Sequence, residues 1–451
     1  MQLYWQAKIW GLLHDPIFKA LYDNNGRGGT GWWEKLPAMQ AWVALPPEQR
    51  EKLENYVKLA DQISSASDRG AIGNLETAVD YNSDGLEISH LLSGAKQDWQ
   101  TKTDRHLQVS SKSGSQRKKY LNIEEQEILN SIPDSIKNGD ARQLFWWLWR
   151  CLPAAACRKF DRDPSLLLMP AETRLPDGSI WSHSSMTAAL AGALIGYDTT
   201  MAEFQEIDPK KLYYNAYSHP YLVSFTFTPV QELIKASRKM RDFWAGSWIL
   251  HYVSAHISWK LACKYGADSL LYPSLFNQPL IDLWLLEKYP DFASWIRKPP
   301  IDSLLTAGFP NVLVLVLPKA KVAAAMQFAE QELKQVWQDL GNDVFNELGK
   351  SNWIRELKKD SSTWNGWLDT QWQVYWTGVP IGVENAPLKS AKILQDPNTL
   401  SDRDIQYAQP WVVKLNQHYG LVVAVSRDQE ESRSRKLLIT ILCSIQFDLL
   451  C

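Results

Sequence analysis

The chain has 451 residues and a net charge of −2, with 48 basic and 50 acidic side chains. This length corresponds to about three domains. A content of 45% hydrophobic and 22% charged residues is ordinary for a globular protein and excludes wholesale disorder. The balanced charge excludes a global attraction to nucleic acid, so any basic surface must be local. The five cysteines include no C-x-x-C pair, which argues against a disulfide framework or a zinc ribbon.

The sequence carries no signal for export or membrane insertion. The first 14 residues lack the basic segment and the small-residue cleavage site of a signal peptide. The longest purely apolar run, residues 312–317, is far shorter than the ~20 residues of a membrane span. We therefore expect a cytoplasmic protein with no membrane partner.

Residues 1–140 are predicted to be mainly helical. One helix is indicated by an apolar stripe at helical spacing, formed by Trp5, Ile9, Leu12 and Leu13. A second is expected over residues 51–68, after a loop rich in Gly, Asn and Pro at 24–37. The polar, Ser- and Lys-rich residues 97–119 are predicted to form an exposed connection.

The next segments add helices and then strands. Helices are expected over residues 140–159 and 184–196, separated by an irregular stretch. From residue 220 the pattern changes: strands are predicted at 221–228, 269–272, 311–317 and 373–376, and long helices at 229–264 and 320–340. This mixture predicts an α+β or α/β unit over residues 215–390. The tail after residue 433 ends in an apolar run without a cap, as a severed or misread end would.

His14 and Asp15 are the first candidate metal ligands. Pro16 disfavours a helical conformation at Asp15, so the pair would project from a helix break. An imidazole and a carboxylate together suit a divalent transition metal that activates water. Asp61 is the preferred further ligand; Asp68, one residue before Arg69, is better explained as a surface ion pair. The alternative is a helix-terminal histidine that is simply hydrogen-bonded to its neighbour.

The second candidate region follows the predicted strand 221–228. Thr228, Pro229 and Gln231, with Val230 between them, have the pattern of a capping box at a helix start, where free N–H groups can bind phosphates. Lys235, Arg238 and Lys239 would form a cationic ridge on the same helix. Gly246 and Ser247 would let a ligand approach closely. A solvated basic face and a helix-packing contact explain these features equally well.

Several blocks together resemble the large subunit of type III CRISPR–Cas complexes, in its III-B (Cmr) branch. Lys8–Leu21 and Ala60–Arg69 are similar to the permuted HD nuclease domain of that family. The stretch PAETRLPDGSIWSH, residues 170–183, is similar to a family block in which aspartate is usual at the position of Glu172. Residues 227–232, 237–247 and 272–282 look like its first palm domain.

The resemblance implies an α+β architecture of four parts. These are a helical HD-like domain at 1–140, a helical linking region at 141–214, a ferredoxin-like palm with long helices at 215–390, and a truncated helical region at 391–451. It implies a divalent metal (Mn, Ni, Co or Mg) at His14, Asp15 and Asp61, and ATP at the palm. The nucleotide-binding residues would be Thr228, Pro229, Val230, Gln231, Arg238 and Ser247.

Family features of the second palm are missing from this sequence. It contains no Asp-Asp dipeptide and no zinc-binding cysteine cluster. Cyclic oligoadenylate synthesis needs carboxylates for two metal ions, so it is not expected from this chain alone. The chain is therefore expected to be an N-terminal fragment of the large subunit or a split or disrupted gene product.

Three functional hypotheses follow. The first is a subunit of an RNA-guided antiviral complex that carries a nucleotide-binding palm and an HD nuclease for single-stranded DNA. Its partners would be other Cmr subunits and, through the complex, crRNA and target RNA. The second is a catalytically inactive architectural fragment that docks on those subunits or on crRNA. The third is a stand-alone nucleotide phosphohydrolase, which rests on His14, Asp15 and Asp61 alone.

Overall fold

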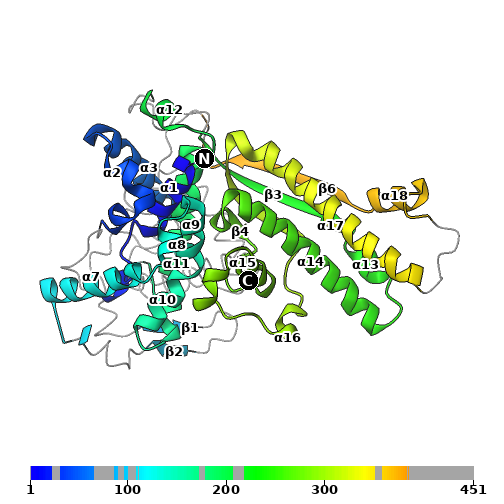
Figure 1. Ribbon diagram of the computed structural model, residues 1–451, viewed down its shortest axis with the longest axis horizontal. Coiled ribbons are helices and arrows are strands. Elements are labelled where there is room, and N and C mark those ends of the chain that lie inside the picture. Colours follow the sequence, from blue (N-terminus) through cyan, green and yellow to red (C-terminus); the bar gives the residue numbers. More distant parts are fainter. Residues whose placement is uncertain are drawn as a thin grey trace, which may run out of the picture. The chain divides into compact units, whose positions relative to one another are not determined.

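The computed structural model describes residues 2–22, 31–65, 86–89, 96–99, 108–109, 111–171, 178–206, 218–350, 358–382 and 384 (Figure 1). Asp68, Glu172 and the predicted region 391–451 lie outside these residues. Within the described ranges, every helix is too short or too polar to cross a membrane. The fold there is mostly helical with small antiparallel sheets, and therefore α+β as predicted.

The chain forms two compact units built from segments far apart in sequence. Unit 1 comprises Met1–Lys8, Gly139–Cys151 and Ala189–Pro387. Unit 2 comprises the described residues between Ile9 and Asn138 and between Leu152 and Ala188. The helices α1 (Gln2–Leu13) and α11 (Ile180–Ile195) contribute residues to both units. The predicted domain boundaries at 140, 214 and 390 remain predictions.

Unit 1 contains a four-stranded antiparallel sheet in the order β4-β5-β3-β6. Its strands are β3 (Pro220–Thr228), β4 (Leu270–Tyr272), β5 (Val312–Pro318) and β6 (Gln373–Pro380), which confirms the four predicted strands. In β3 the alternate residues Val223, Phe225 and Phe227 are fully buried. Successive side chains of a strand point to opposite faces, so this alternation gives the sheet one buried face.

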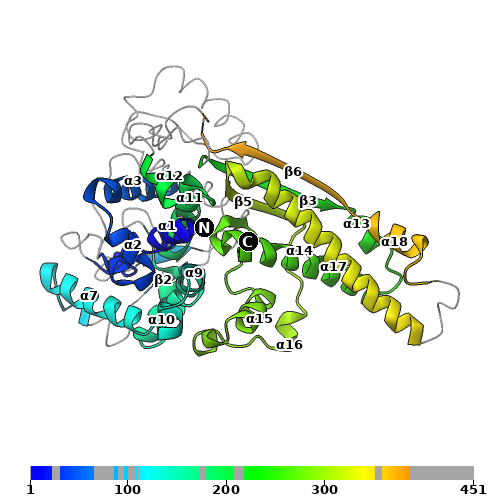
Figure 2. The same cartoon turned by 45° about the horizontal axis from the view of Figure 1, so that its top comes forward.

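Two long helices, α14 (Met240–Tyr265) and α17 (Val322–Lys350), pack together against one face of this sheet (Figure 2). The opposite face is open among the described residues. On it Leu222 is paired with Val379 and is 38% exposed, while Val379 is 52% exposed and Tyr375 is 55% exposed.

Unit 1 also contains a buried ion pair. Lys8 Nζ donates hydrogen bonds of 2.7 and 2.8 Å to the carboxylate of Asp268 and one of 2.9 Å to Ser269 Oγ. Both charged side chains are fully buried. The other helices of unit 1 are α9 (Ala141–Arg150), α12 (Met201–Glu206), α13 (Gln231–Lys235), α15 (Pro279–Lys288), α16 (Ile301–Leu304) and α18 (Ser362–Asp369).

Unit 2 is mainly helical where it is described. Its helices are α2 (Gln40–Val43), α3 (Pro47–Ser64), α7 (Gly114–Asn130), α8 (Asp134–Lys137) and α10 (Leu152–Lys159). It also contains an antiparallel pair, β1 (Leu86–Ser89) with β2 (Lys96–Trp99).

One prediction about these segments was wrong and another was confirmed in part of its detail. The stretch 97–119 is not simply a connection, because it contains most of β2 and the start of α7. The helical segment predicted over 140–159 is confirmed, and it consists of two helices, α9 and α10, which are separated at Cys151. Pro153 explains the break, because proline lacks the N–H that would continue α9 and its ring clashes with the preceding turn.

Candidate metal centre

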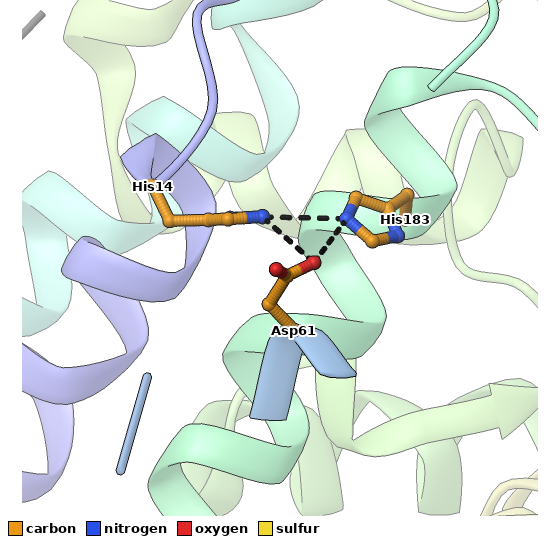
Figure 3. Close-up of side chains that lie close together, drawn as sticks. All are labelled: His14, Asp61 and His183. Carbon is orange, nitrogen blue, oxygen red and sulfur yellow. Dashed lines mark hydrogen bonds and ion pairs between the residues drawn. The ribbon is translucent and has the colours of Figure 1, made fainter. Parts of the chain in front are cut away.

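Three side chains from distant parts of unit 2 point toward one another (Figure 3). His14 follows the last residue of α1, Asp61 lies in the last turn of α3, and His183 lies in the first turn of α11. Pro16 is two residues beyond His14, so the chain turns away from the helix there, as the sequence predicted.

The polar atoms of these residues form a small triangle. His14 Nε2 lies 3.3 Å from His183 Nε2 and 3.5 Å from Asp61 Oδ1, and His183 Nε2 lies 3.2 Å from the same oxygen. Ligand atoms about 2.1 Å from one ion, at tetrahedral or octahedral angles, are about 3.0 to 3.5 Å apart. The triangle therefore has the dimensions of three ligands around one divalent ion.

The remaining polar atoms of these side chains are held by neighbours. His14 Nδ1 lies 2.7 Å from the carbonyl oxygen of Gly11, and His183 Nδ1 lies 3.1 Å from Ser64 Oγ. Because a carbonyl only accepts, Nδ1 of His14 is the protonated nitrogen, and the lone pair of Nε2 faces the cluster. Ser65 Oγ donates to Asp61 Oδ1 over 2.9 Å. Such outer contacts orient metal ligands in known sites.

Asp15 lies at the edge of the cluster. Its Oδ2 is 3.4 Å from His14 Nε2 and 3.8 Å from His183 Nε2, and it accepts a hydrogen bond of 2.6 Å from Lys19 Nζ. Lys19 thus adds a positive charge to a site that otherwise holds two carboxylates and two imidazoles.

Electrostatics favour charged carboxylates here. Burial alone would raise the pKa of Asp15, but His14 and Lys19 outweigh it and lower that pKa. The pKa of Asp61 is likewise lowered against burial, by its hydrogen bonds to the two histidines. Burial would lower the pKa of His14, yet Asp15 and Asp61 raise it. The site is therefore arranged to hold positive charge.

A close approach between α1 and α11 brings the two histidines together. A Cβ atom on Gly11 would lie 2.6 Å from the Cα of Ala188, a distance that real Cβ atoms do not show. His14 is one turn beyond Gly11, and His183 is five residues before Ala188. The glycine is therefore required where these helices cross.

The structure brings together the three residues that the sequence suggested and adds a fourth. His14, Asp15 and Asp61 all lie at the cluster. His183 was not proposed as a ligand, although it ends the block 170–183 that resembles a family motif. Its position at the end of that block was the available signal. Its 169-residue separation from His14 concealed the contact.

The second candidate region differs from its prediction. The expected capping box is not formed, because α13 begins at Gln231 with Val230 as its N-cap and no side chain caps it. The single helix expected over 229–264 is broken, since α13 ends at Lys235 and α14 starts at Met240. Lys239 between them is extended, at φ −132° and ψ 158°, and an extended residue cannot continue a helix.

The residues of this region are therefore differently arranged. Lys235, Arg238 and Lys239 do not form a helical ridge, because only Lys235 lies in a helix. Arg238 is exposed, and Ser247 is half-buried in α14. Thr228 is the last residue of β3, and Pro229 follows it. Whether these residues bind a nucleotide stays a prediction.

Comparisons with known proteins agree with the resemblance. The family model "CRISPR-associated protein Cmr2, N-terminal" matches residues 222–342. A CRISPR system Cmr subunit Cmr2 of Pyrococcus furiosus is 27% identical over 379 residues, covering 76% of this chain and 38% of that protein. The Cmr2 subunit of Saccharolobus solfataricus is 25% identical over 290 residues, covering 62% and 24%. The chain thus spans less than half the length of these relatives.

The fold is also similar to a solved structure. A chain in the cryo-EM structure of type III-B Cmr-beta bound to cognate target RNA matches with a TM-score of 0.51 and 17% identity. The match covers 95% of this chain and 40% of that chain. At this identity the similarity concerns the fold alone.

Proposed function

Because the chain is a Cmr2-type large subunit of type III-B CRISPR–Cas systems, over part of that subunit's length, we propose that it contributes a metal-dependent nuclease centre to such a complex. Its substrate is single-stranded DNA, and its partners are other Cmr subunits, crRNA and target RNA. The observation that carries the proposal is the convergence of His14, Asp61 and His183 on one point, with Asp15 and Lys19 beside them.

The donor set fits a divalent transition metal. Two imidazole nitrogens and a carboxylate oxygen suit Mn, Co or Ni, whereas Mg prefers oxygen ligands. His14, Asp61 and His183 would hold the ion. When bound, it supplies a Lewis acid that activates water and polarises a phosphoryl oxygen.

The neighbouring residues would support phosphodiester hydrolysis. Asp15 stays ionised, because His14 and Lys19 lower its pKa, so it can accept a hydrogen bond from the attacking water and orient it. Lys19 Nζ, 2.6 Å from Asp15, would offer a positive charge to a phosphate on which negative charge develops. The site therefore offers both orientation and charge stabilisation.

Cleavage of a labelled oligonucleotide tests this proposal. The full chain should cleave single-stranded DNA with Mn²⁺, Co²⁺ or Ni²⁺, and EDTA should stop the reaction. The cleavage rate should fall by at least about 100-fold in each of the variants His14→Ala, Asp61→Asn and His183→Ala. His256→Ala, a histidine of α14 in unit 1, should leave it unchanged. Equal activity in all four variants would show that a contaminant is responsible.

We further propose that unit 1 binds ATP through the region of Thr228, Pro229, Val230, Gln231, Arg238 and Ser247. Support comes from the architecture, because an antiparallel sheet covered on one face by α14 and α17 leaves its other face open. Titration calorimetry should detect ATP binding that Arg238→Gln weakens. Binding that Arg238→Gln leaves unchanged would refute the role of Arg238.

Cyclic oligoadenylate synthesis is not part of the proposal. The sequence has no adjacent aspartate pair to hold the two metal ions that this reaction needs. Incubation of the chain alone with ATP and Mg²⁺ or Mn²⁺ should therefore yield no cyclic product. If the chain assembles with Cmr subunits and crRNA but cleaves no DNA in any metal, the architectural alternative is correct.

A further inference from the structure

A basic groove lies along α7 in unit 2. It is a cavity of about 520 Å³ formed by one side of α7 and by Lys35, the last residue of the 3-10 helix Trp32–Lys35. We call it the α7 groove. Its lining residues are Lys35, Ser115, Lys118, Lys119, Asn122, Ile123, Gln126 and Glu127.

The charge in the α7 groove is positive. Three lysines line it against one acid, Glu127, which is paired with Lys159 of α10. Lys118 and Lys119 make no ion pair with any residue that the structure describes. Since the chain as a whole carries −2, this is a local basic site of the kind that binds phosphate groups.

The neutral amides of the groove are already oriented. Lys35 Nζ donates to Gln126 Oε1 over 2.6 Å, and Gln126 in turn donates to Asn130 over 3.0 Å. The hydroxyl of Tyr22 donates to Asn122 Oδ1 over 2.7 Å. Because the carbonyl oxygen of this side-chain amide accepts from Tyr22, the NH₂ group of Asn122 remains as a hydrogen-bond donor for an anion.

Helix α7 is hydrogen-bonded to the segment that follows Asp15. Glu125 of α7 accepts a hydrogen bond of 2.9 Å from the backbone N–H of Phe18, and Asn122 accepts from Tyr22. The seven Cα–Cα steps from Asp15 to Tyr22 could span at most about 25 Å. Single-stranded nucleic acid sites cover about 4 to 16 nucleotides, so one strand could contact both places.

We propose that the α7 groove binds the phosphodiester backbone of single-stranded DNA and so extends the metal centre. The part of this inference that concerns DNA cleavage rests on the proposed nuclease function. The recognised chemistry is a phosphate ester, which could also come from a free nucleotide. The described residues that line the groove include lysines and no aromatic ring, so the interaction is electrostatic and independent of base sequence.

Binding in EDTA tests the groove without any catalysis. The full chain is titrated into a fluorescent dT20 oligonucleotide at several salt concentrations. Lys118→Gln/Lys119→Gln should bind dT20 about 10-fold more weakly at low salt. Because two phosphate contacts are lost, the magnitude of its slope of log K against log salt should fall by about 1.4. A matched control, Lys137→Gln/Lys298→Gln, removes the same charge elsewhere and should bind as wild type does.

Three outcomes would overturn the inference. The first is that the wild type does not bind dT20, or that the two double variants bind it with equal affinity. The second is a lower melting temperature for Lys118→Gln/Lys119→Gln that accounts for its weaker binding. The third is ATP binding that the same variant loses while dT20 binding persists, because the groove would then be a mononucleotide site.

Turnover separates the groove from the metal centre. Lys118→Gln/Lys119→Gln should hydrolyse the small diester bis(p-nitrophenyl) phosphate at the wild-type rate and cleave dT20 with a raised KM and an unchanged kcat. If the wild type binds dT20 through the groove but hydrolyses neither substrate, the nuclease proposal fails and the groove stands. Equal KM values for dT20 in wild type and variant would refute its role in cleavage.

Discussion

His183 is the most buried member of the candidate metal centre, with 5% of its side chain exposed. Its Nε2 faces Asp61 and its Nδ1 lies 3.1 Å from Ser64 Oγ, so the imidazole is fixed at both nitrogens. Such a ring needs no rearrangement before it binds an ion, and this lowers the entropy cost of binding. The precision of the site therefore depends on Ser64, which is no ligand itself.

Replacing this supporting hydroxyl should weaken metal binding. Ser64→Ala removes the partner of His183 Nδ1, and loss of such outer contacts typically costs about 10 to 100-fold in metal affinity. Competition with a fluorescent chelator measures the affinity for Mn²⁺. Ser111→Ala, which removes an exposed hydroxyl that bonds to Gln108, is the control. Equal affinities in the two variants would show that Ser64 does not position the histidine.

Glu125 is a second buried polar residue, and its burial makes the stability of the protein depend on pH. It is fully buried, and burial raises its pKa to about 8, although the Phe18 amide and the Tyr22 hydroxyl act in the opposite direction. The folded protein therefore keeps a proton on Glu125 at pH values where the unfolded chain has lost it. The stability that this proton contributes is fully present below about pH 4.5 and is lost as the pH rises through 8.

Glu125→Gln should remove this pH dependence. The amide resembles the protonated acid, so the variant should gain stability over the wild type between pH 5 and 8, by up to about 1.4 kcal/mol per pH unit. Urea unfolding at a series of pH values measures the difference. A constant difference across this range would mean that Glu125 does not hold its proton in the folded protein.

At the scale of elements, the crossing of α1 and α11 decides whether a metal centre exists. Each helix carries one histidine, and the distance between these imidazoles depends on how closely the backbones approach at Gly11 and Ala188. A side chain at position 11 must push the helices apart, because the atoms it meets belong to the backbone.

Gly11→Ala should therefore weaken both stability and metal binding. Alanine favours helix formation by about 1 kcal/mol over glycine, but overpacking typically costs about 1 to 3 kcal/mol. We expect net destabilisation and loss of Mn²⁺ affinity. Gly366→Ala in α18 is the matched control, since nothing lies within 4 Å of its added Cβ, and it should stabilise the protein slightly. Wild-type metal affinity in Gly11→Ala would contradict the crossing argument.

The ion pair between Lys8 and Asp268 joins the middle of α1 to the 3-10 turn after α14. Because both side chains are fully buried, burial lowers the pKa of Lys8 and raises that of Asp268. Lys8→Met should leave Asp268 buried without its partner and cost about 3 to 5 kcal/mol. Lys8→Met/Asp268→Leu should lose less than this. Thermal unfolding measures both, and a double variant less stable than Lys8→Met would contradict the argument.

At the scale of the whole molecule, each unit combines segments from distant parts of the chain. Unit 2 holds the metal centre and the α7 groove, and unit 1 holds the sheet with its open face. The chain therefore separates the proposed DNA cleavage from the proposed ATP binding.

A bound ion should stabilise the folded chain by mass action. At a Mn²⁺ concentration 100 times the Kd, the gain is about 2.7 kcal/mol, if the unfolded chain does not bind the metal. Differential scanning calorimetry should thus show a higher melting temperature with Mn²⁺ in the wild type. His14→Ala should show no such rise, and an equal rise in both proteins would show that the ion binds elsewhere.

The sequence by itself determined the four strands of unit 1, the helix that became α17, the resemblance to Cmr2 and three residues of the candidate centre. The alternation of Val223, Phe225 and Phe227 predicts a strand because this pattern is local: it can be recognised from residues that are neighbours in the sequence. The pair His14 and Asp15 is likewise visible as a local pattern.

Only the tertiary structure decided the partners of these residues. His183 meets His14 across 169 positions, Lys8 meets Asp268 across 260, and Glu125 meets Phe18 across 107. No local pattern encodes such contacts. They arise because burial of apolar helix faces brings distant segments together, and a buried polar group must then find a partner wherever the packing provides one.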